Sequence, residues 1–181
     1  MRKLSNPELN RPDINRYKKI NKIPVIIVLD NIRSHNNIGS VFRTADAFLI
    51  NSIYLCGITP VPPHRDIHKT ALGAELSVEW KYFTNTLDAI NNLKQNNYKI
   101  LLVEQIEPKT YLNNFVYDSN QKYAFVFGNE VGGISNNILD IADSAIEIPQ
   151  FGTKHSLNIS ITVSIVIWDY FIKNSQIYPQ L

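Results

Sequence analysis

Short apolar segments recur along the chain, and polar stretches separate them. Five of these segments, each five or six residues long, are rich in valine, isoleucine, tyrosine or phenylalanine. Such segments are typical of strands buried in a sheet. The sequence therefore predicts strands at residues 24–29, 52–56, 99–103, 123–127 and 144–148.

Helical periodicity is found between these segments, at residues 39–50, 86–95 and 135–142. Residues 157–171 are dense in β-branched residues, which favour a strand locally, but the length of this segment favours a buried helix. Strands that alternate with helices indicate an α/β fold with a mostly parallel sheet flanked by helices. We expect one such domain at residues 23–181, preceded by a separate arm at residues 1–22.

Length and composition support a single globular domain with its own core. The chain has 181 residues, of which 44% are hydrophobic and 19% are charged. Its one cysteine, Cys56, allows neither an internal disulfide nor a cysteine-built zinc site. The first residues lack the apolar stretch of a secretory signal, and residues 159–172 are too short to span a bilayer. We expect a cytoplasmic protein without a membrane segment.

Positive charge is concentrated at the start of the chain. Residues 1–22 hold seven basic and two acidic side chains, a net charge of +5 in a protein whose total is +2. Charge alone favours a solvated, frayed end. A basic arm that binds RNA phosphates is the alternative, and its candidate residues are Arg11, Arg16, Lys18 and Lys19.

Ligands of parallel α/β sheets collect at the carboxyl ends of the strands. The first segment in such a position, residues 29–48, passes from a strand through a polar loop into a helix. Asn37 or Ser40 could cap this helix. Arg43 is harder to explain structurally, because a cation near a helix amino terminus opposes the helix dipole and Asp46 is only a weak surface partner. An arginine here suits a phosphate or ribose ligand.

The second segment, residues 125–135, runs from a buried strand into a turn with three glycines. Its pattern is neither that of a phosphate-binding loop nor that of a dinucleotide fingerprint. An ordinary strand-to-helix turn explains it by composition. Alternatively, Glu130 beside the glycines could accept a hydrogen bond from a substrate hydroxyl or orient Arg43.

The third segment, residues 148–160, contains a loop with Gly152 and the polar start of an apolar helix. Ser156 could be the N-cap of this helix. Asn158 lies just inside the expected helix, where an amide is poorly suited to burial unless it is hydrogen-bonded. A functional hydrogen-bond partner would explain Asn158 at this position.

Together, these segments resemble the three motifs of the SpoU (TrmH-like) RNA 2′-O-ribose methyltransferases, which belong to the SPOUT superfamily. The matching residues are Asn37-x-Gly39-x-x-x-Arg43, then Phe127-Gly-Asn-Glu130-x-Gly-Gly, then Ile148-Pro with Ser156-Leu-Asn158-x-Ser160. Residues 69–74 also resemble an intermediate segment of the family. The resemblance covers about residues 24–170. It implies a carboxyl-terminal deep trefoil knot that binds S-adenosylmethionine, no metal, and a homodimer with the active site at the subunit interface.

The resemblance also implies roles for individual residues. Asn37 and Arg43 would hold and activate the ribose or its phosphate, and Glu130, Ser156 and Asn158 would complete the catalytic group. Arginine stays protonated in proteins, so we expect an electrostatic role for Arg43, with the proton leaving through phosphate, Glu130 or water. The residues expected to bind the cofactor are Val103, Gly128, Ile148, Ser156 and Leu157.

The expected substrate is transfer RNA, with ribosomal RNA as the alternative. An RNA-binding module of the same fold without turnover is a second possibility, against which intact Arg43, Glu130 and Asn158 argue. A nucleotide-binding oxidoreductase is disfavoured because no glycine fingerprint follows the first strand. His64 and His68 are four residues apart, but no third metal ligand is evident. The roles of His35 and His155 stay open.

Overall fold

The computed structural model describes residues 1–5 and 7–174. In this part of the chain, seven strands form one sheet in the order β3-β2-β1-β6-β4-β7-β5, and all of its paired strands are parallel. This arrangement confirms the predicted α/β class. The strands are β1 (Ile23–Asp30), β2 (Ile50–Cys56), β3 (Glu79–Phe83), β4 (Tyr98–Val103), β5 (Thr110–Tyr111), β6 (Lys122–Phe127) and β7 (Ser144–Glu147).

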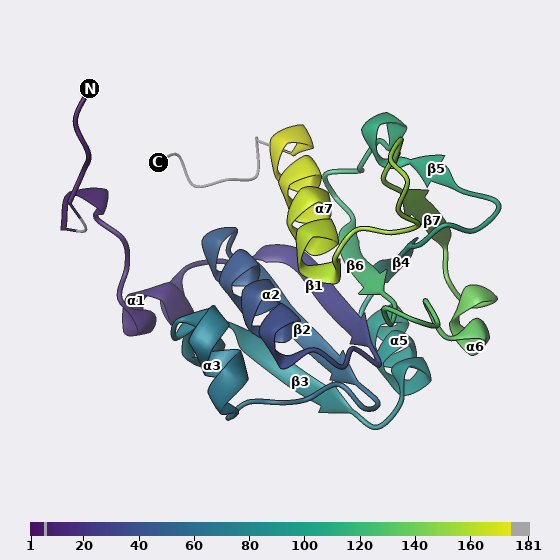
Figure 1. Cartoon of the computed structure of the whole chain (residues 1–181), viewed down its shortest axis with the longest axis horizontal. Coiled ribbons are helices and arrows are strands. Elements are labelled where there is room, and N and C mark those ends of the chain that lie inside the picture. Colours follow the sequence, from purple (N-terminus) through teal and green to yellow (C-terminus); the bar gives the residue numbers. More distant parts are fainter. Residues whose placement is uncertain (6, 175–181) are drawn as a thin grey trace.

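Helices cover both faces of the sheet (Figure 1). They are α1 (Ile14–Lys19), α2 (His35–Ala47), α3 (Arg65–Ala71), α4 (Ala74–Ser77), α5 (Thr86–Gln95), α6 (Asn136–Leu139) and α7 (Ile159–Lys173), with short 3-10 helices at Pro7–Leu9 and Leu112–Asn114. Successive side chains of a strand point to opposite faces. In β1, Val25 and Ile27 accordingly pack with α2 and α7, whereas Ile26 and Val28 pack with α5 and α6.

All five predicted strands are present, but several of the predicted helix boundaries were wrong. Helix α2 begins at His35, because the Ser34 hydroxyl accepts a hydrogen bond from the backbone N–H of Asn37 (3.3 Å). Ser34 is therefore the N-cap, rather than Asn37 or Ser40. The predicted end at Ile50 is also wrong, since this residue already begins β2. The helix predicted at residues 135–142 is a single turn, α6.

Several elements were not predicted from the sequence. Strand β3 lies at one edge of the sheet, and most of its side chains are exposed. Its sequence, Glu-Trp-Lys-Tyr-Phe, therefore lacks the continuous apolar pattern of the inner strands. Helices α3 and α4 are too short to show a clear period.

The amino-terminal residues extend from the body on the side of the molecule away from β7 (Figure 1). Within residues 1–22, however, α1 packs against α4, and Tyr17 is buried in the main core. Arg11, Arg16, Lys18 and Lys19 are all exposed. The basic residues are thus displayed on a segment that is anchored by one aromatic side chain.

The carboxyl-terminal part of the described chain packs back onto its beginning. Helix α7 contacts α2, and β6 lies between β1 and β4 although it follows both in the sequence. The trefoil knot stays a prediction. None of the helices within residues 1–5 and 7–174 has the length and apolarity required to cross a membrane.

Candidate active site

A cavity of about 310 Å³ lies at the carboxyl ends of β4, β6 and β7. Strand residues Val103, Phe127 and Ile146 form its floor, and the loops that follow β6 and β7 form its walls. All five residues expected to bind the cofactor line this cavity: Val103, Gly128, Ile148, Ser156 and Leu157. Three segments far apart in the sequence thus meet at the position where parallel sheets bind ligands.

The glycine-rich turn after β6 folds tightly on itself. The backbone N–H groups of Asn129 and Gly133 each donate to the carbonyl oxygen of the other residue, both at 2.9 Å. Gly133 has a φ of +67°, which favours glycine. At Gly128, a Cβ atom would lie 2.3 Å from the backbone of Gly133 and of Ile134. A side chain at residue 128 is therefore incompatible with this wall of the cavity.

A buried carboxyl group ties this turn to the end of β1. Asp30 is fully buried, and its Oδ2 atom accepts a hydrogen bond from the backbone N–H of Ser135 (2.8 Å). Its Oδ1 atom accepts from the Thr86 hydroxyl (2.5 Å) and from the Asn31 amide (2.8 Å). Asn129 in turn donates to the carbonyl oxygen of Asn31 (2.6 Å). These bonds hold the turn in place, and Asn129 also lines the cavity, whereas Asp30 does not.

Three of the expected catalytic residues form a hydrogen-bonded chain. The Asn158 amide donates to Asn37 Oδ1, and the Asn37 amide donates to Glu130 Oε1, each at 3.2 Å. Asn158 is also the N-cap of α7, since its Oδ1 accepts from the backbone N–H of Ser160 (2.9 Å). The N-cap role considered for Ser156 was therefore wrong. This series of hydrogen bonds links all three motif segments. Glu130 and Ser156 also line the cavity.

Arg43 lies elsewhere. It is exposed and lines a second hollow of about 520 Å³ between α2, α3 and α7, together with Lys69, Ser160 and Ser164. Asn37 and Arg43 are six residues apart on α2, so their side-chain directions differ by a rotation of about 240° around the helix axis. The two side chains therefore point to different sides of α2. Among the described residues, the Arg43 side chain has no hydrogen-bond or ion-pair partner. The first turns of α7 separate this hollow from the cavity.

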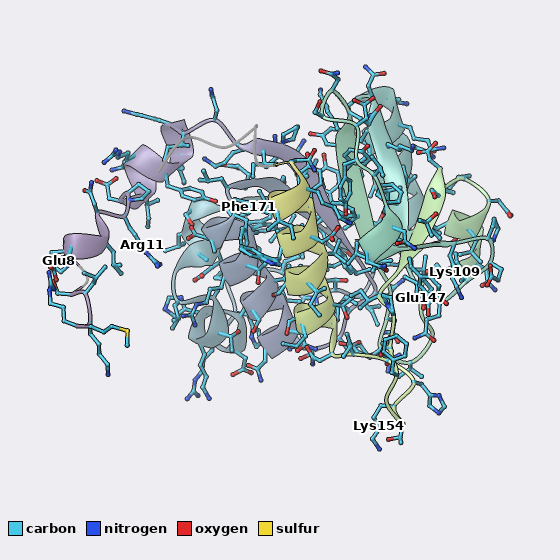
Figure 2. All side chains as sticks on the ribbon, turned by 90° about the horizontal axis from the view of Figure 1, so that it is seen from above. Glu8, Arg11, Lys109, Glu147, Lys154 and Phe171 are labelled. Atoms are coloured by element: carbon cyan, nitrogen blue, oxygen red, sulfur yellow. The ribbon has the colours of Figure 1, made fainter. Side chains whose placement is uncertain are left out.

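Polar residues that the sequence reasoning missed also line the cavity. Glu104 and Gln105 directly follow β4, and Glu147 ends β7. Glu104 accepts hydrogen bonds from the backbone N–H groups of Gln105 (2.8 Å) and Ile134 (3.3 Å). Glu147 forms an ion pair with Lys109 (2.7 Å), and Figure 2 shows these two side chains together. The strand-end rule, applied to residues 99–103, would have found Glu104 and Gln105.

The histidines have separate surroundings. The rings of His35 and His64 stack at 3.8 Å, and His64 Nδ1 accepts from the backbone N–H of Asp66 (3.2 Å) at the start of α3. His68 Nδ1 lies 2.5 Å from Glu75 Oε1. The His155 carbonyl accepts from the Gln105 amide (2.7 Å). Among residues 1–5 and 7–174, no group of three or more His, Cys, Asp or Glu side chains could hold a metal ion.

Comparison with known proteins assigns the chain to a family. Residues 24–168 match the SpoU rRNA Methylase family. The chain belongs to this family. Among curated relatives of this SpoU protein is a Staphylococcus saprophyticus protein named for the TrmH family of tRNA/rRNA methyltransferases, which is 28% identical over 162 residues. The match covers 90% of this chain and 64% of the relative, so the chain spans less than two thirds of that protein's length.

Solved structures have the same fold. The TrmH/SpoU tRNA modifying enzyme of A. aeolicus is 22% identical, with a TM-score of 0.77 over 90% of this chain and 83% of that chain. An AdoMet-bound rRNA methyltransferase from Sinorhizobium meliloti is also 22% identical, with a TM-score of 0.77 over 90% of this chain and 61% of that chain. At this level of identity, the similarity shows that the chain shares the fold of these structures.

Proposed function

We propose that the protein transfers a methyl group from S-adenosylmethionine to a ribose 2′-hydroxyl of RNA, with transfer RNA as the first candidate substrate and ribosomal RNA as the second. One observation carries the proposal. The residues that the family resemblance assigns to the cofactor line a single cavity, and a hydrogen-bonded chain of Asn37, Glu130 and Asn158 lies beside it. We further propose that the reaction takes place in the cytoplasm.

The cavity suits this cofactor. Its volume is within the range of small-molecule sites, about 300–1,000 Å³. Apolar side chains from the strands and from Leu157 would face the adenine base, and the carboxyl group of Glu104 would favour a cation such as the sulfonium. At Gly128, the backbone of Gly133 and Ile134 occupies the space of a side chain, so no side chain of residue 128 narrows the cavity.

The cofactor supplies an electrophilic methyl group, so that the ribose oxygen forms a C–O bond while the C–S bond breaks and the hydroxyl proton leaves. Asn37 and Asn158 orient the ribose in this proposal, since alignment of the reacting atoms lowers the barrier. Glu130 is exposed, and its Oε2 atom has no hydrogen-bond partner within residues 1–5 and 7–174. This oxygen can therefore accept the hydroxyl proton, directly or through water.

Arg43 requires a different explanation, because it lines the second hollow. We propose that two copies of the chain associate, so that Arg43 of one copy completes the site of the other and stabilises negative charge on the RNA. The exposed apolar side chains of α7 support an interface at this helix. Ile161, Trp168 and Ile172 are 52%, 51% and 49% exposed. They form one stripe of α7, as their spacing of seven and four residues requires.

Mixed dimers test this arrangement. Arg43→Ala and Glu130→Ala chains would be co-expressed with different affinity tags, and the mixed dimer would be isolated. Each variant alone should be inactive, whereas the mixed dimer contains one complete site and should regain about half of the activity per dimer. An inactive mixed dimer would place Arg43 in the site of its own chain. Sedimentation of the unmodified protein as a monomer would remove the arrangement altogether.

The central test is methyl transfer from labelled S-adenosylmethionine into total RNA that lacks the corresponding modifications. Nuclease digestion then identifies the methylated nucleoside. A 2′-O-methylated nucleoside in the transfer RNA fraction is expected, and the same product in ribosomal RNA would change the substrate only. A methylated base would refute ribose chemistry. Cofactor and RNA binding without any transfer would favour a module that has lost turnover.

A further inference from the structure

The loop between β7 and α7 carries an aromatic side chain that the chain itself leaves uncovered. Phe151 is 97% exposed. Its neighbours in the loop, Ile148, Gln150 and His155, line the cavity, whereas Phe151 does not. Figure 2 shows that this loop projects from the body and that Lys154 lies at its tip. The ring is therefore displayed beside the cavity and not within it.

The loop is anchored close to the site. The Gln105 amide donates to the His155 carbonyl (2.7 Å), and Asn158 caps the helix that follows. At Gly152, beside Phe151, an added Cβ atom would have no neighbour within 4 Å. The two ends of the loop are thus fixed at the cavity, while the surroundings of Phe151 have room for a ligand.

The charge of the loop is suited to nucleic acid. Residues 148–158 contain Lys154 and His155 but no acidic residue. The Lys154 side chain is exposed and forms no hydrogen bond or ion pair with the described part of the chain. An exposed aromatic ring and a free cation on one loop are the combination that binds unpaired nucleotides, because the ring stacks on a base and the cation contacts a phosphate.

We infer that Phe151 stacks on an unpaired base of the RNA, next to the ribose that is methylated. The inference rests on the proposed function and adds a substrate-binding residue to it. A phenyl ring has no hydrogen-bonding group, so Phe151 would hold any base and would position the RNA rather than read its sequence. Lys154 would contact a phosphate of the same strand.

A second copy of the chain is the other surface that could cover the ring. The two occupants differ in what they require of residue 151. Stacking on a base requires a flat aromatic side chain, whereas packing against a protein surface requires apolar volume. The variants Phe151→Ala, Phe151→Leu and Phe151→Trp therefore distinguish them. Val116→Ala is the matched control, because Val116 is 86% exposed and lines neither hollow.

The experiment measures the RNA affinity, the affinity for S-adenosylmethionine by calorimetry, and the KM and kcat of methyl transfer for each full-length variant. Loss of one base stack should weaken RNA binding about 5- to 150-fold in Phe151→Ala. Phe151→Leu should lose nearly as much, and Phe151→Trp should retain the unmodified affinity. Cofactor affinity should stay unchanged throughout, and Val116→Ala should match the unmodified protein.

Tryptophan fluorescence gives an independent readout. In Phe151→Trp, RNA should quench emission beyond the quenching seen with Trp80 and Trp168 alone, since a stacked base quenches indole. Normal affinity in Phe151→Leu, or a change of oligomeric state in Phe151→Ala, would overturn stacking and assign the ring to a protein contact. Normal RNA affinity and KM in Phe151→Ala would overturn this inference alone. Failure of the unmodified protein to bind or methylate RNA would overturn both the proposed function and the inference about Phe151.

Discussion

Replacing Gly128 with alanine tests whether the tight turn after β6 forms the cavity. The added Cβ atom would lie 2.3 Å from the carbonyl carbon of Gly133, whereas ordinary contact begins at 3.4 Å. The obstacle is backbone, so no side chain can rotate away. The backbone at residue 128 and the backbone at residues 133–134 must therefore move apart by about 1 Å, which disrupts their close packing.

The energetic cost follows from that movement. Overpacking costs about 1–3 kcal/mol, and the two hydrogen bonds between Asn129 and Gly133 contribute about 0.5–1.5 kcal/mol each. Gly128→Ala should therefore lower the free energy of unfolding by about 2–6 kcal/mol. The displaced turn is also one wall of the cavity, so the affinity for S-adenosylmethionine should fall in those molecules that still fold.

Urea unfolding and calorimetric titration with S-adenosylmethionine measure the two effects. Gly132→Ala is the matched control: its Cβ would have no neighbour within 4 Å, and its φ is not positive, so both quantities should stay close to those of the unmodified protein. A Gly128→Ala protein that folds and binds the cofactor as tightly as Gly132→Ala does would refute this role of the turn.

Other predictions concern the capping residue, the thiol, alkaline stability and the arm. Asn158→Asp should keep the cap of α7 and the stability of the protein but lose methyl transfer, because the amide that donates to Asn37 is gone. Asn158→Ala should also lower the free energy of urea unfolding by about 0.5–2 kcal/mol. Equal activity of Asn158→Asp and the unmodified protein would contradict this. Burial raises the pKa of the Cys56 thiol to about 12, so Ellman's reagent should label it only after unfolding. Burial also raises the pKa of Tyr170 to about 12 from 10.0, so the unfolded chain loses the hydroxyl proton at lower pH than the folded chain does. The stability that is present below pH 10 should therefore decline as the pH rises towards 12. A urea midpoint that stays constant between pH 9 and 12 would refute this prediction. Replacing Arg11, Arg16, Lys18 and Lys19 with glutamine should weaken RNA binding at low salt and spare cofactor binding, and unchanged RNA affinity would leave the arm without this role.

The inner strands and the place of the site could be predicted from the sequence, because both depend on local patterns. The buried strands are continuously apolar, and polar residues follow them at the edge where parallel sheets bind ligands. The cofactor residues expected from the family resemblance accordingly lie around one cavity. Their roles in binding and catalysis stay predictions.

Features that depend on tertiary contacts could not be predicted. Gly39 stands in a motif, yet an added Cβ would lie 2.3 Å from the Ile67 carbonyl oxygen, so its small size serves the packing of α2 against α3. Asp30 ends an apolar segment, and only the folded chain reveals its bond to Ser135. Similarly, Arg43 lies away from Glu130 because Asn37, which contacts Glu130, and Arg43 point in different directions around α2.

The sheet order also determines how a growing chain can acquire this fold. Strands β1, β2 and β3 pair side by side and leave the ribosome early, but the other edge of β1 pairs with β6, in a register that joins Val25 to Tyr123. Until β6 has been synthesised, the buried strand β1 presents an open apolar edge, which is prone to pair with other chains. Translation speed through residues 57–127, and chaperones that shield the nascent chain, should therefore govern the yield of folded protein.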